Sequence, residues 1–380
     1  MSSIFKKDTT VFFKSPAGSR LWGCWFQGMH VLVLHSFLTN AIVWSFNCTE
    51  IFILFARYLM GEFSFIQWIR KRQRRRKGTL LGIGDDCAVI DVSSDKLCLI
   101  TTDMLVDGTH FDLKKCAMRD VGRKAIACSI SDVAAMGCQA TVAVISICFP
   151  YHTTEKYARE LYAGMWSLTD KYNIEIIGGD TISGCGPLCI NVTMLGNDGG
   201  LKPIRRSGAK AGDMILVTGE FGGSILGKHL CFEPRQQEGL ILNKNFTIHA
   251  MIDISDGLTA DLNHILEESR TGAILHEDQI PISPAAIELS KKTGHTPLHH
   301  ALSDGEDYEL LLTVSKGQAK RVFASGLLEG MRCIGEIVDG QGIRMKYADG
   351  KIRRIRPRGY EHLTSQPEQV GRDTNNHVFF

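Results

Sequence analysis

From residue 79 onward, short apolar runs alternate with segments whose apolar residues recur every three or four positions. The first pattern is typical of buried strands and the second of helices that cover a sheet. The apolar runs predict strands at Leu97–Thr101, Thr141–Phe149, Ile174–Ile177, Leu188–Leu195, Met214–Thr218, Ala250–Ile254, Tyr308–Val314 and Cys333–Val338. The other segments predict helices at Asp120–Met136, Thr154–Tyr172, Pro284–Lys292 and Gln318–Ala324, and further helices beginning near Ser224 and after Gly257. With a hairpin at Asp349-Gly350, this is an α/β (α+β) pattern.

A polar, turn-rich segment, Ser207–Asp213, interrupts this alternation. Chains of this length commonly divide into two domains, and such a segment is typical of the boundary between them. We therefore predict an N-terminal domain at residues 60–200 and a C-terminal domain at residues 201–364. The polar residues 365–380 predict a disordered tail.

Residues 1–59 differ in character from the rest, because residues 29–59 are mostly apolar. This run is just long enough for a membrane-spanning helix, with the basic segment Arg70–Lys77 as its cytoplasmic flank. Two other interpretations are a small folded addition and an extension that the functional protein does not need. We favour the dispensable extension, because Met60-Gly-Glu-Phe63 and the amphipathic pattern after it form a natural beginning. Arg70–Lys77 is then a solvated loop, and a chain without residues 1–59 should be active.

The composition, 44% hydrophobic and 22% charged residues, is that of a globular protein. The formal net charge of +2 gives no broad basic field, so nucleic acid is not an expected partner. The 12 cysteines are scattered without CxxC pairs, which indicates reduced thiols and a cytoplasmic protein. The sequence contains no GxxxxGK[ST], no protein-kinase HRD or DFG set and no GxSxG, which argues against P-loop, protein-kinase and serine-hydrolase sites.

Aspartates next to Gly, Ser or Thr recur along the chain, mostly where an apolar strand is predicted to end. They occur in Gly82-Ile-Gly-Asp-Asp86, Thr101-Thr-Asp103, Ser131-Asp132, Gly178-Gly-Asp180 and Asp253-Ile-Ser-Asp-Gly257. Crowded carboxylates repel one another unless a cation neutralises them, and oxygen ligands suit Mg²⁺. We therefore predict a site for several Mg²⁺ ions that holds a polyphosphate. Such a site needs no general base when the acceptor is itself a phosphate oxygen.

Simpler roles compete with this interpretation at two places. Asp132 lies within a predicted helix and could be a satisfied surface residue, and Asp256 could be only the N-cap of the helix that follows it. The glycine-rich turn Gly219–Gly223 precedes a predicted helix and could bind phosphate, although such a turn alone is a weak signal.

Nine segments in register resemble the bacterial thiamine-monophosphate kinase family, within the superfamily of aminoimidazole ribotide synthetase. They are Gly82-Ile-Gly-Asp-Asp86, Thr101-Thr-Asp103, Gly108-Thr-His-Phe111, Ser131-Asp-Val-Ala-Ala-Met-Gly137, Gly178-Gly-Asp-Thr181, Arg206-Ser-Gly-Ala-Lys210, Asp253-Ile-Ser-Asp-Gly-Leu258, Gly305-Glu-Asp-Tyr-Glu-Leu310 and Gly359-Tyr-Glu-His362. Each is weak alone, but the ordered set covers nearly all of the chain from Met60 to about Leu363.

The resemblance implies ATP- and Mg²⁺-dependent phosphorylation of thiamine monophosphate to thiamine diphosphate. It also implies a two-domain aminoimidazole ribotide synthetase-like fold, with an N-terminal mixed sheet with helices, a C-terminal α/β domain and a homodimer formed through the N-terminal sheets. By motif match, the metal ligands would be Asp86, Thr101, Thr102, Asp103, Asp132, Asp180, Asp253 and Asp256. ATP would contact Gly179, Asp180, Arg206 and Ser255, and thiamine monophosphate would contact His110, Glu306 and Tyr360.

The residues themselves support these roles unequally. Arg206 is a plausible phosphate fork but also fits a solvated loop. His110 could be structural, and Tyr360 alone would suit a core aromatic. Sequence alone cannot choose between Glu306 and the acids beside it for the contact with thiamine monophosphate. Asp85 has a weaker claim than Asp86 to be a metal ligand.

Other functions remain open at this stage. A metal-dependent phosphohydrolase would use the same acids to activate water, and other ATP-using members of the superfamily share the general pattern. A membrane-tethered nucleotide sensor would require residues 31–56 to enter a bilayer.

Overall fold

The computed structural model describes residues 66–67, 70–71, 78–93 and 96–362, together with the backbone of three N-terminal strands. These strands, β1 (Thr9–Lys14), β2 (Arg20–Phe26) and β3 (Met29–Leu34), pair in antiparallel order β1-β2-β3. The apolar run that begins at residue 29 thus starts as a strand. Residues 35–65 and 363–380 lie outside the described residues, so the interpretations of the extension and of the tail stay predictions. No described helix has both the length and the apolar character needed to cross a membrane.

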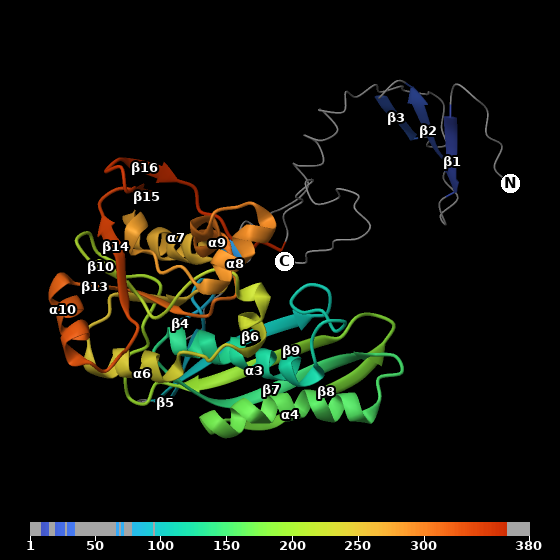
Figure 1. Cartoon of the computed structure of the whole chain (residues 1–380). Helices are drawn as coiled ribbons and strands as arrows, with labels where there is room; N and C mark the ends of the chain where they lie inside the picture. The colour runs from blue at the N-terminus through green and yellow to red at the C-terminus, as the bar shows by residue number, and fades with distance from the viewer. Residues whose placement is uncertain are drawn as a thin grey trace. The chain divides into compact units, whose positions relative to one another are not determined.

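The larger compact unit, Ile69–Tyr360, contains two mixed sheets (Figure 1). The six-stranded sheet has the order β4-β5-β6-β9-β7-β8, with β7 and β8 parallel and the other neighbours antiparallel. Its strands are β4 (Thr79–Leu81), β5 (Ala88–Ser93), β6 (Lys96–Val106), β7 (Gln139–Pro150), β8 (Glu175–Gly184) and β9 (Cys189–Asn197). The expected mixed N-terminal sheet is therefore present.

Helices α3 (Met118–Ala135) and α4 (Glu155–Tyr172) lie along one face of this sheet (Figure 1). They pack closely at two glycines, because a Cβ added to Gly122 or Gly164 would collide with a backbone carbonyl oxygen of the other helix. Helix α3 begins earlier than predicted: its N-cap is Ala117, and Asp120 lies in its first turn. The close packing makes α3 a rigid support in the middle of the unit.

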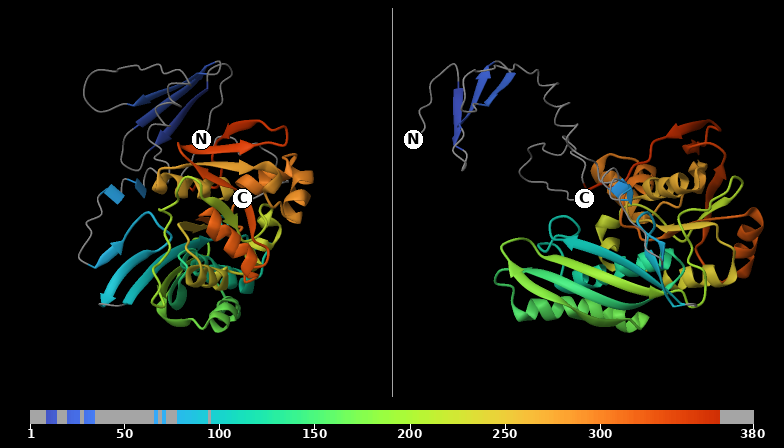
Figure 2. Two further views of the ribbon diagram at one scale, coloured as in Figure 1. Left: turned by 90° about the vertical axis from the view of Figure 1, so that its left-hand side faces the viewer. Right: turned by 180° about the vertical axis from the view of Figure 1, so that it is seen from behind.

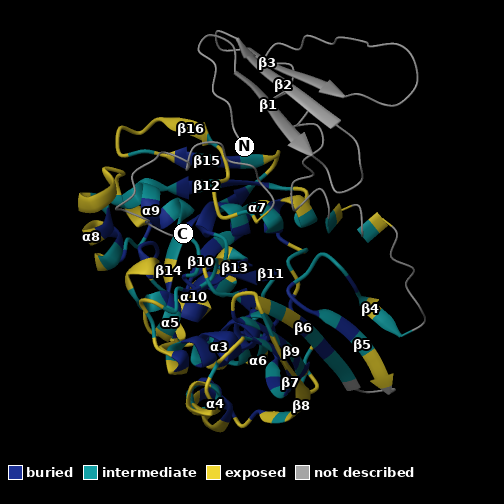
Figure 3. Ribbon diagram, turned by 90° about the vertical axis from the view of Figure 1, so that its right-hand side faces the viewer, coloured by how far each residue is buried: buried dark blue, intermediate teal, exposed yellow. Residues whose placement is uncertain are grey.

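Burial alternates along β6, β7 and β9, as expected for a sheet covered on one face. On β6, Leu99, Thr101 and Leu105 are buried, whereas Thr102 and Met104 are exposed. Figure 3 shows the same change between buried and exposed positions along the neighbouring strands. Among the residues that the structure describes, the face opposite α3 and α4 is therefore open.

The seven-stranded sheet has the order β11-β13-β10-β14-β12-β15-β16, with only β12 and β15 parallel. Its strands are β10 (Met214–Val217), β11 (Ala250–Asp253), β12 (Gly272–His276), β13 (Leu310–Val314), β14 (Arg332–Val338), β15 (Gly342–Lys346) and β16 (Ile352–Ile355). One core, on the face of α7 (Leu258–Ser269) and α9 (Pro297–Ser303), contains Leu262, Ile265 and Ala301. The other face packs against α6 (Gln236–Asn245) and α10 (Lys316–Ser325) (Figure 2). Helix α8 (Pro284–Thr293) packs beside α9.

Most predicted elements are confirmed, but two strands continue through the motifs that were expected to end them. Thr101–Asp103 lies inside β6, and Gly178–Asp180 lies inside β8, which is an edge strand with largely exposed side chains. Strands β4, β5 and β12 and helices α6 and α9 were not predicted. The helix expected near Ser224 consists of a 3₁₀ turn, Ser224–Leu226, and a short helix α5, Lys228–Cys231.

Candidate active site

Three aspartates from distant parts of the chain converge in the described unit. Asp86 follows β4, Asp132 lies on α3, and Asp253 ends β11. One carboxylate oxygen from each lies within 4.8 Å of the other two. We refer to Asp86, Asp132 and Asp253 as the acid cluster. Asp132 therefore lies next to two other acids, and its role as a metal ligand stays a prediction.

Hydroxyl groups orient these carboxylates. Thr101 donates to Asp132, and Ser131 Oγ donates to Asp253 Oδ2 at 2.6 Å. Ser129 Oγ donates in the same way to Asp103 Oδ2 at 2.5 Å. Both serines belong to α3, so this one helix fixes acids on β6 and β11.

Arg206 reaches the cluster from the segment before β10. Its Nη2 donates to Asp86 Oδ1 at 2.7 Å, and its backbone N–H donates to Asp85 Oδ1 at 3.2 Å. Asp86 Oδ2 and Arg206 Nε are buried, and neither has a hydrogen-bond partner in the described part of the chain. A buried acceptor beside a buried donor without partners is costly, and it suits a site that a cation and an anionic ligand complete.

The acids are strained electrostatically in the absence of a cation. Burial raises the pKa of Asp132 well above its ordinary value, and the charges of Asp103, Asp253 and Asp86 raise it further. Burial and the charge of Asp86 raise the pKa of Asp253 and of Asp85 to about 7. A divalent cation would favour the ionised forms. Because every donor here is a carboxylate or hydroxyl oxygen, the residues fit Mg²⁺.

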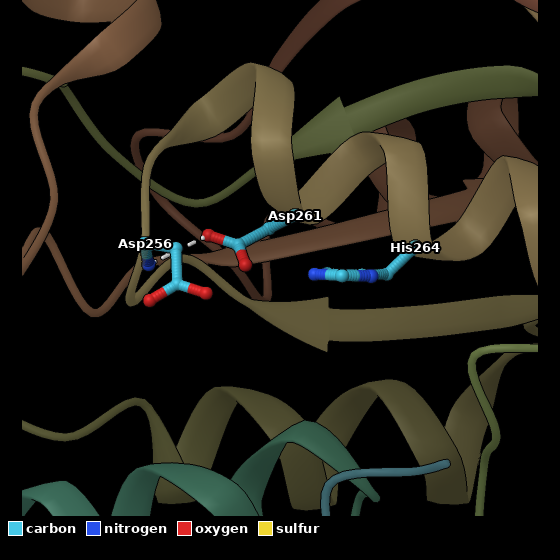
Figure 4. Close-up of side chains that lie close together, drawn as sticks. All are labelled: Asp256, Asp261 and His264. Atoms are coloured by element: carbon cyan, nitrogen blue, oxygen red, sulfur yellow. Dashed lines mark hydrogen bonds between the residues drawn. The ribbon is translucent and has the colours of Figure 1, made fainter. Parts of the chain in front are cut away.

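A second group, Asp256, Asp261 and His264, lies at the start of α7 (Figure 4). Asp261 Oδ2 accepts hydrogen bonds from the backbone N–H groups of Asp256 and Gly257, each at 3.0 Å. The N-cap residue is Gly257, and no side chain caps the helix from that position. The interpretation of Asp256 as a mere N-cap is therefore wrong, because the buried Asp261 holds this turn.

The same turn connects the predicted ATP residues with the predicted substrate residues. The backbone N–H of Glu306 donates to Ser255 O at 2.7 Å, and that of Tyr360 donates to Asp256 O at 3.0 Å. Gly305 permits this approach, since an added Cβ would lie 2.6 Å from Ser255 O.

His110 and Glu306 are brought together by a residue that the sequence analysis did not single out. Lys124 Nζ donates to His110 O at 2.6 Å and forms an ion pair with Glu306. His110 Nδ1 also accepts a hydrogen bond from Val106 N at 3.1 Å. The available signal was a lysine eight residues before Asp132, among small and apolar residues of a helix. Such a position implies burial, and a buried lysine requires a partner.

Three predicted site residues are not brought to the acid cluster. The Thr102 side chain lies on the open face of the sheet, where Asn191 Nδ2 donates to its Oγ1 at 3.0 Å and Thr193 Oγ1 lies 3.2 Å away. Asp180 is exposed on β8, and its Oδ1 accepts a hydrogen bond from Thr181 N at 2.9 Å. A Cβ added to Gly179 would collide with Ile145 O, so close pairing of β7 and β8 requires a glycine there.

Two amides of the glycine-rich turn already donate hydrogen bonds to carboxylates of the chain. Gly222 N donates to Asp307 Oδ2 at 2.9 Å, and Gly223 N donates to Asp304 Oδ2 at 2.8 Å. These two N–H groups are therefore not available to a phosphate, which weakens the possibility of a phosphate-binding turn here.

The arrangement is suited to binding a polyphosphate through divalent cations. Family models match both sheets: "AIR synthase related protein, N-terminal domain" matches residues 84–197, and "AIR synthase related protein, C-terminal domain" matches residues 199–348. These matches agree with the fold described above.

Curated relatives share substantial sequence identity with this chain. The thiamine-monophosphate kinase of Rhodopirellula baltica is 39% identical over 308 residues, which cover 79% of this chain and 97% of that protein. The thiamine-monophosphate kinase of Mycobacterium tuberculosis is 35% identical over 302 residues, which cover 74% of this chain and 86% of that protein.

Solved structures are similar as well. The structure described as "AaThiL complexed with AMPPCP and TMP" has a TM-score of 0.65 and 29% identity, and the match covers 84% of this chain and 99% of that one. The thiamine-monophosphate kinase of Stenotrophomonas maltophilia has a TM-score of 0.61 and 34% identity, covering 76% of this chain and 97% of that one. HypE of E. coli, a hydrogenase maturation protein, is 19% identical with a TM-score of 0.60, and it shares the fold alone.

Proposed function

The chain belongs to the thiamine-monophosphate kinase family, and from this premise we propose that it phosphorylates thiamine monophosphate directly from ATP at a site for several Mg²⁺ ions. ATP-dependent phosphorylation of thiamine monophosphate is the activity of the family. The observation that carries the proposed site is the convergence of Asp86, Asp132 and Asp253, where a buried oxygen of Asp86 has no hydrogen-bond partner among the described residues.

The metal ligands in this proposal start with the acid cluster. Asp103 and Thr101 are joined to it through α3, since Ser129 bonds Asp103 and Thr101 bonds Asp132. Asp256, on the turn held by Asp261, would contribute to a further metal position. Bound Mg²⁺ would neutralise phosphate charge during transfer.

The residues of the chain would bind and align the two substrates. Arg206 and Ser255 would hold the phosphates of ATP, and Arg206 Nε is a buried donor available for that purpose. His110, Glu306 and Tyr360 would hold thiamine monophosphate. Because the accepting atom is a phosphate oxygen, no residue has to remove a proton from it.

The ligand roles of Thr102, Gly179 and Asp180 stay predictions within this scheme, although these residues lie away from the acid cluster.

The open face of the six-stranded sheet exposes Met104 and Ile182. We propose that a second copy of the chain covers this face in a homodimer, because exposed apolar residues on a sheet favour association. Sedimentation equilibrium would give the mass of one chain if this part of the proposal were wrong.

We also place the enzyme in the cytoplasm, because ATP is found there and the cysteines of the described residues are free.

The decisive experiment uses the full chain with Mg²⁺, γ-labelled ATP and thiamine monophosphate. Label should enter thiamine diphosphate, and omission of the acceptor should abolish the transfer. Release of labelled phosphate at the same rate with and without acceptor would instead identify a phosphohydrolase. Asp132→Asn, assayed in parallel, tests whether any activity depends on the acid cluster.

A further inference from the structure

Lys124 is a fully buried lysine in the middle of α3, with 0% of its side chain exposed. An ammonium group taken out of water is strongly unfavourable unless charged or polar partners surround it. Lys124 has two such partners, the carboxylate of Glu306 and the carbonyl oxygen of His110. They come from two segments 196 residues apart in the chain, and both residues carry predicted roles in binding thiamine monophosphate.

The segment that carries Glu306 is held in a conformation that most residues avoid. Glu306 has a φ of 63° and Tyr308 has a φ of 51°, both in the left-handed region. Neither residue is glycine, so each position is strained. Strain of this kind persists only where the surroundings hold it, and it concentrates at functional sites.

Helix α3 supplies the contacts that hold this segment. Lys124 pairs with Glu306, and one turn later Cys128 Sγ lies 3.1 Å from Tyr308 Oη. Ser131, on the following turn, bonds Asp253 of the acid cluster. Residues spaced by four and three lie along one side of a helix. A single helix face therefore sets the distance between the Glu306 segment and the acid cluster.

The Glu306 carboxylate is only partly enclosed. Its Oε1 meets Lys124, while 27% of its side chain is exposed. Thiamine carries a permanently positive thiazolium ring and an aminopyrimidine that donates hydrogen bonds, so a fixed carboxylate is a suitable partner for it. A carboxylate held on one side by a buried ammonium keeps a defined direction at low entropic cost.

We propose that Lys124 is a positioning residue for thiamine monophosphate: it fixes the Glu306 carboxylate and the His110 backbone at a set distance from the acid cluster. The inference rests on the proposed function, since it concerns the acceptor of that reaction. Lys124 does not touch the transferred phosphate, so its removal should weaken binding of the acceptor more than binding of ATP.

The test compares the full-length enzyme with Lys124→Met, Lys124→Arg and Glu306→Gln. Lys124→Met should raise the KM for thiamine monophosphate about tenfold or more, with the KM for ATP changed less than about twofold. Lys124→Arg keeps the charge and should recover part of the loss. Equal changes in both KM values, or an unchanged KM for thiamine monophosphate, would overturn the proposal.

A double variant covers the case in which a single substitution prevents folding. Lys124→Met combined with Glu306→Gln removes both charges, so no buried charge is left unpaired. If Lys124 acts through Glu306, the double variant should have the same KM for thiamine monophosphate as Glu306→Gln alone. Multiplied effects would show that the two residues act independently and would overturn the proposal.

Lys228→Met is the matched control, because Lys228 Nζ donates at 2.9 Å to the buried carboxylate of Glu309, three residues after Glu306. It should lower the melting temperature without changing either KM. The wild-type enzyme separates the two hypotheses. An inactive wild type would overturn the proposed function itself, whereas an active wild type with unaffected Lys124 variants would overturn only the role of Lys124.

Discussion

Ser131 and Asp253 are 122 residues apart in sequence, and the Ser131 hydroxyl donates a hydrogen bond of 2.6 Å to the Asp253 carboxylate. Ser131 belongs to α3 on the six-stranded sheet, and Asp253 ends a strand of the seven-stranded sheet. This bond holds Asp253 beside Asp132, the residue that follows Ser131. The acid cluster is thus assembled where the two sheets meet through α3.

Removal of this bond should weaken metal binding without removing a ligand. Ser131→Ala leaves Asp253 Oδ2 without its α3 donor, so the carboxylate is less well oriented. Loss of such a supporting hydrogen bond typically costs about 10- to 100-fold in metal affinity. We expect the Mg²⁺ concentration for half-maximal activity to rise by at least about tenfold. Ser167→Ala, which removes a hydroxyl that donates to Gly164 O of its own helix, should leave that concentration unchanged.

Neutralising Asp132 should separate activity from stability. Asp132→Asn removes a carboxyl whose ionised form is disfavoured by burial and by the neighbouring acids, so the metal-free protein should melt at a higher temperature than the wild type. Turnover should fall by about 100-fold or more, because a neutral amide is a poor substitute for a carboxylate at a Mg²⁺ site. Thermal melts and steady-state assays on one preparation test both effects. Near-normal turnover at saturating Mg²⁺ would remove Asp132 from the site.

The stability of the metal-free protein should depend on pH in a direction set by the acid cluster. The folded protein raises the pKa of Asp253 to about 7, above its unfolded value of about 3.9. Such a group stabilises the fold fully below the unfolded pKa, and this contribution is lost as the pH rises through the folded pKa. The melting temperature in EDTA should therefore fall from about pH 4 to about pH 7 and level off above it, and excess Mg²⁺ should reverse the fall.

Asp253→Asn is the control for this titration, because it removes the ionisable group from the cluster. Its melting temperature in EDTA should vary less with pH than that of the wild type. An identical pH profile for the two proteins would mean that Asp253 does not account for the effect.

Two glycine substitutions should change stability in opposite directions. Gly164→Ala places a methyl group against Arg119 O where α3 and α4 cross, and forcing the helices apart should cost about 1–3 kcal/mol. Gly317 lies in α10 with open space around it, so Gly317→Ala should stabilise the protein by about 1 kcal/mol through helix propensity. Urea unfolding measures both changes, and a neutral Gly164→Ala would contradict the close packing described for α3.

The alternation of apolar and polar residues was sufficient to predict most strands and helices. The long helices α3 and α4 and strands such as β7 and β13 follow directly from their periodicity. The prediction was less successful where a strand carries polar residues on one face. Thr102 and Asp103 were predicted to follow a strand, yet β6 continues through them. Their backbone pairs with β9, and this pairing does not require apolar side chains. Strand β12 and helix α6 are short or weakly periodic, and tertiary packing decides them.

By itself, the sequence determined which kinds of residue could form the site: oxygen donors beside glycines, in an order that resembles one family. That conclusion depends on chemistry and on order along the chain, both of which are one-dimensional. Only the tertiary structure decided which of these residues meet. In the folded chain Asp86, Asp132 and Asp253 meet, and the Thr102 side chain lies on the opposite face of the six-stranded sheet. Asp304 and Asp307 accept hydrogen bonds from two N–H groups of the glycine-rich turn. The tertiary structure also revealed Lys124, because the burial and partners of a side chain depend on how α3 packs between two sheets, which no local pattern encodes.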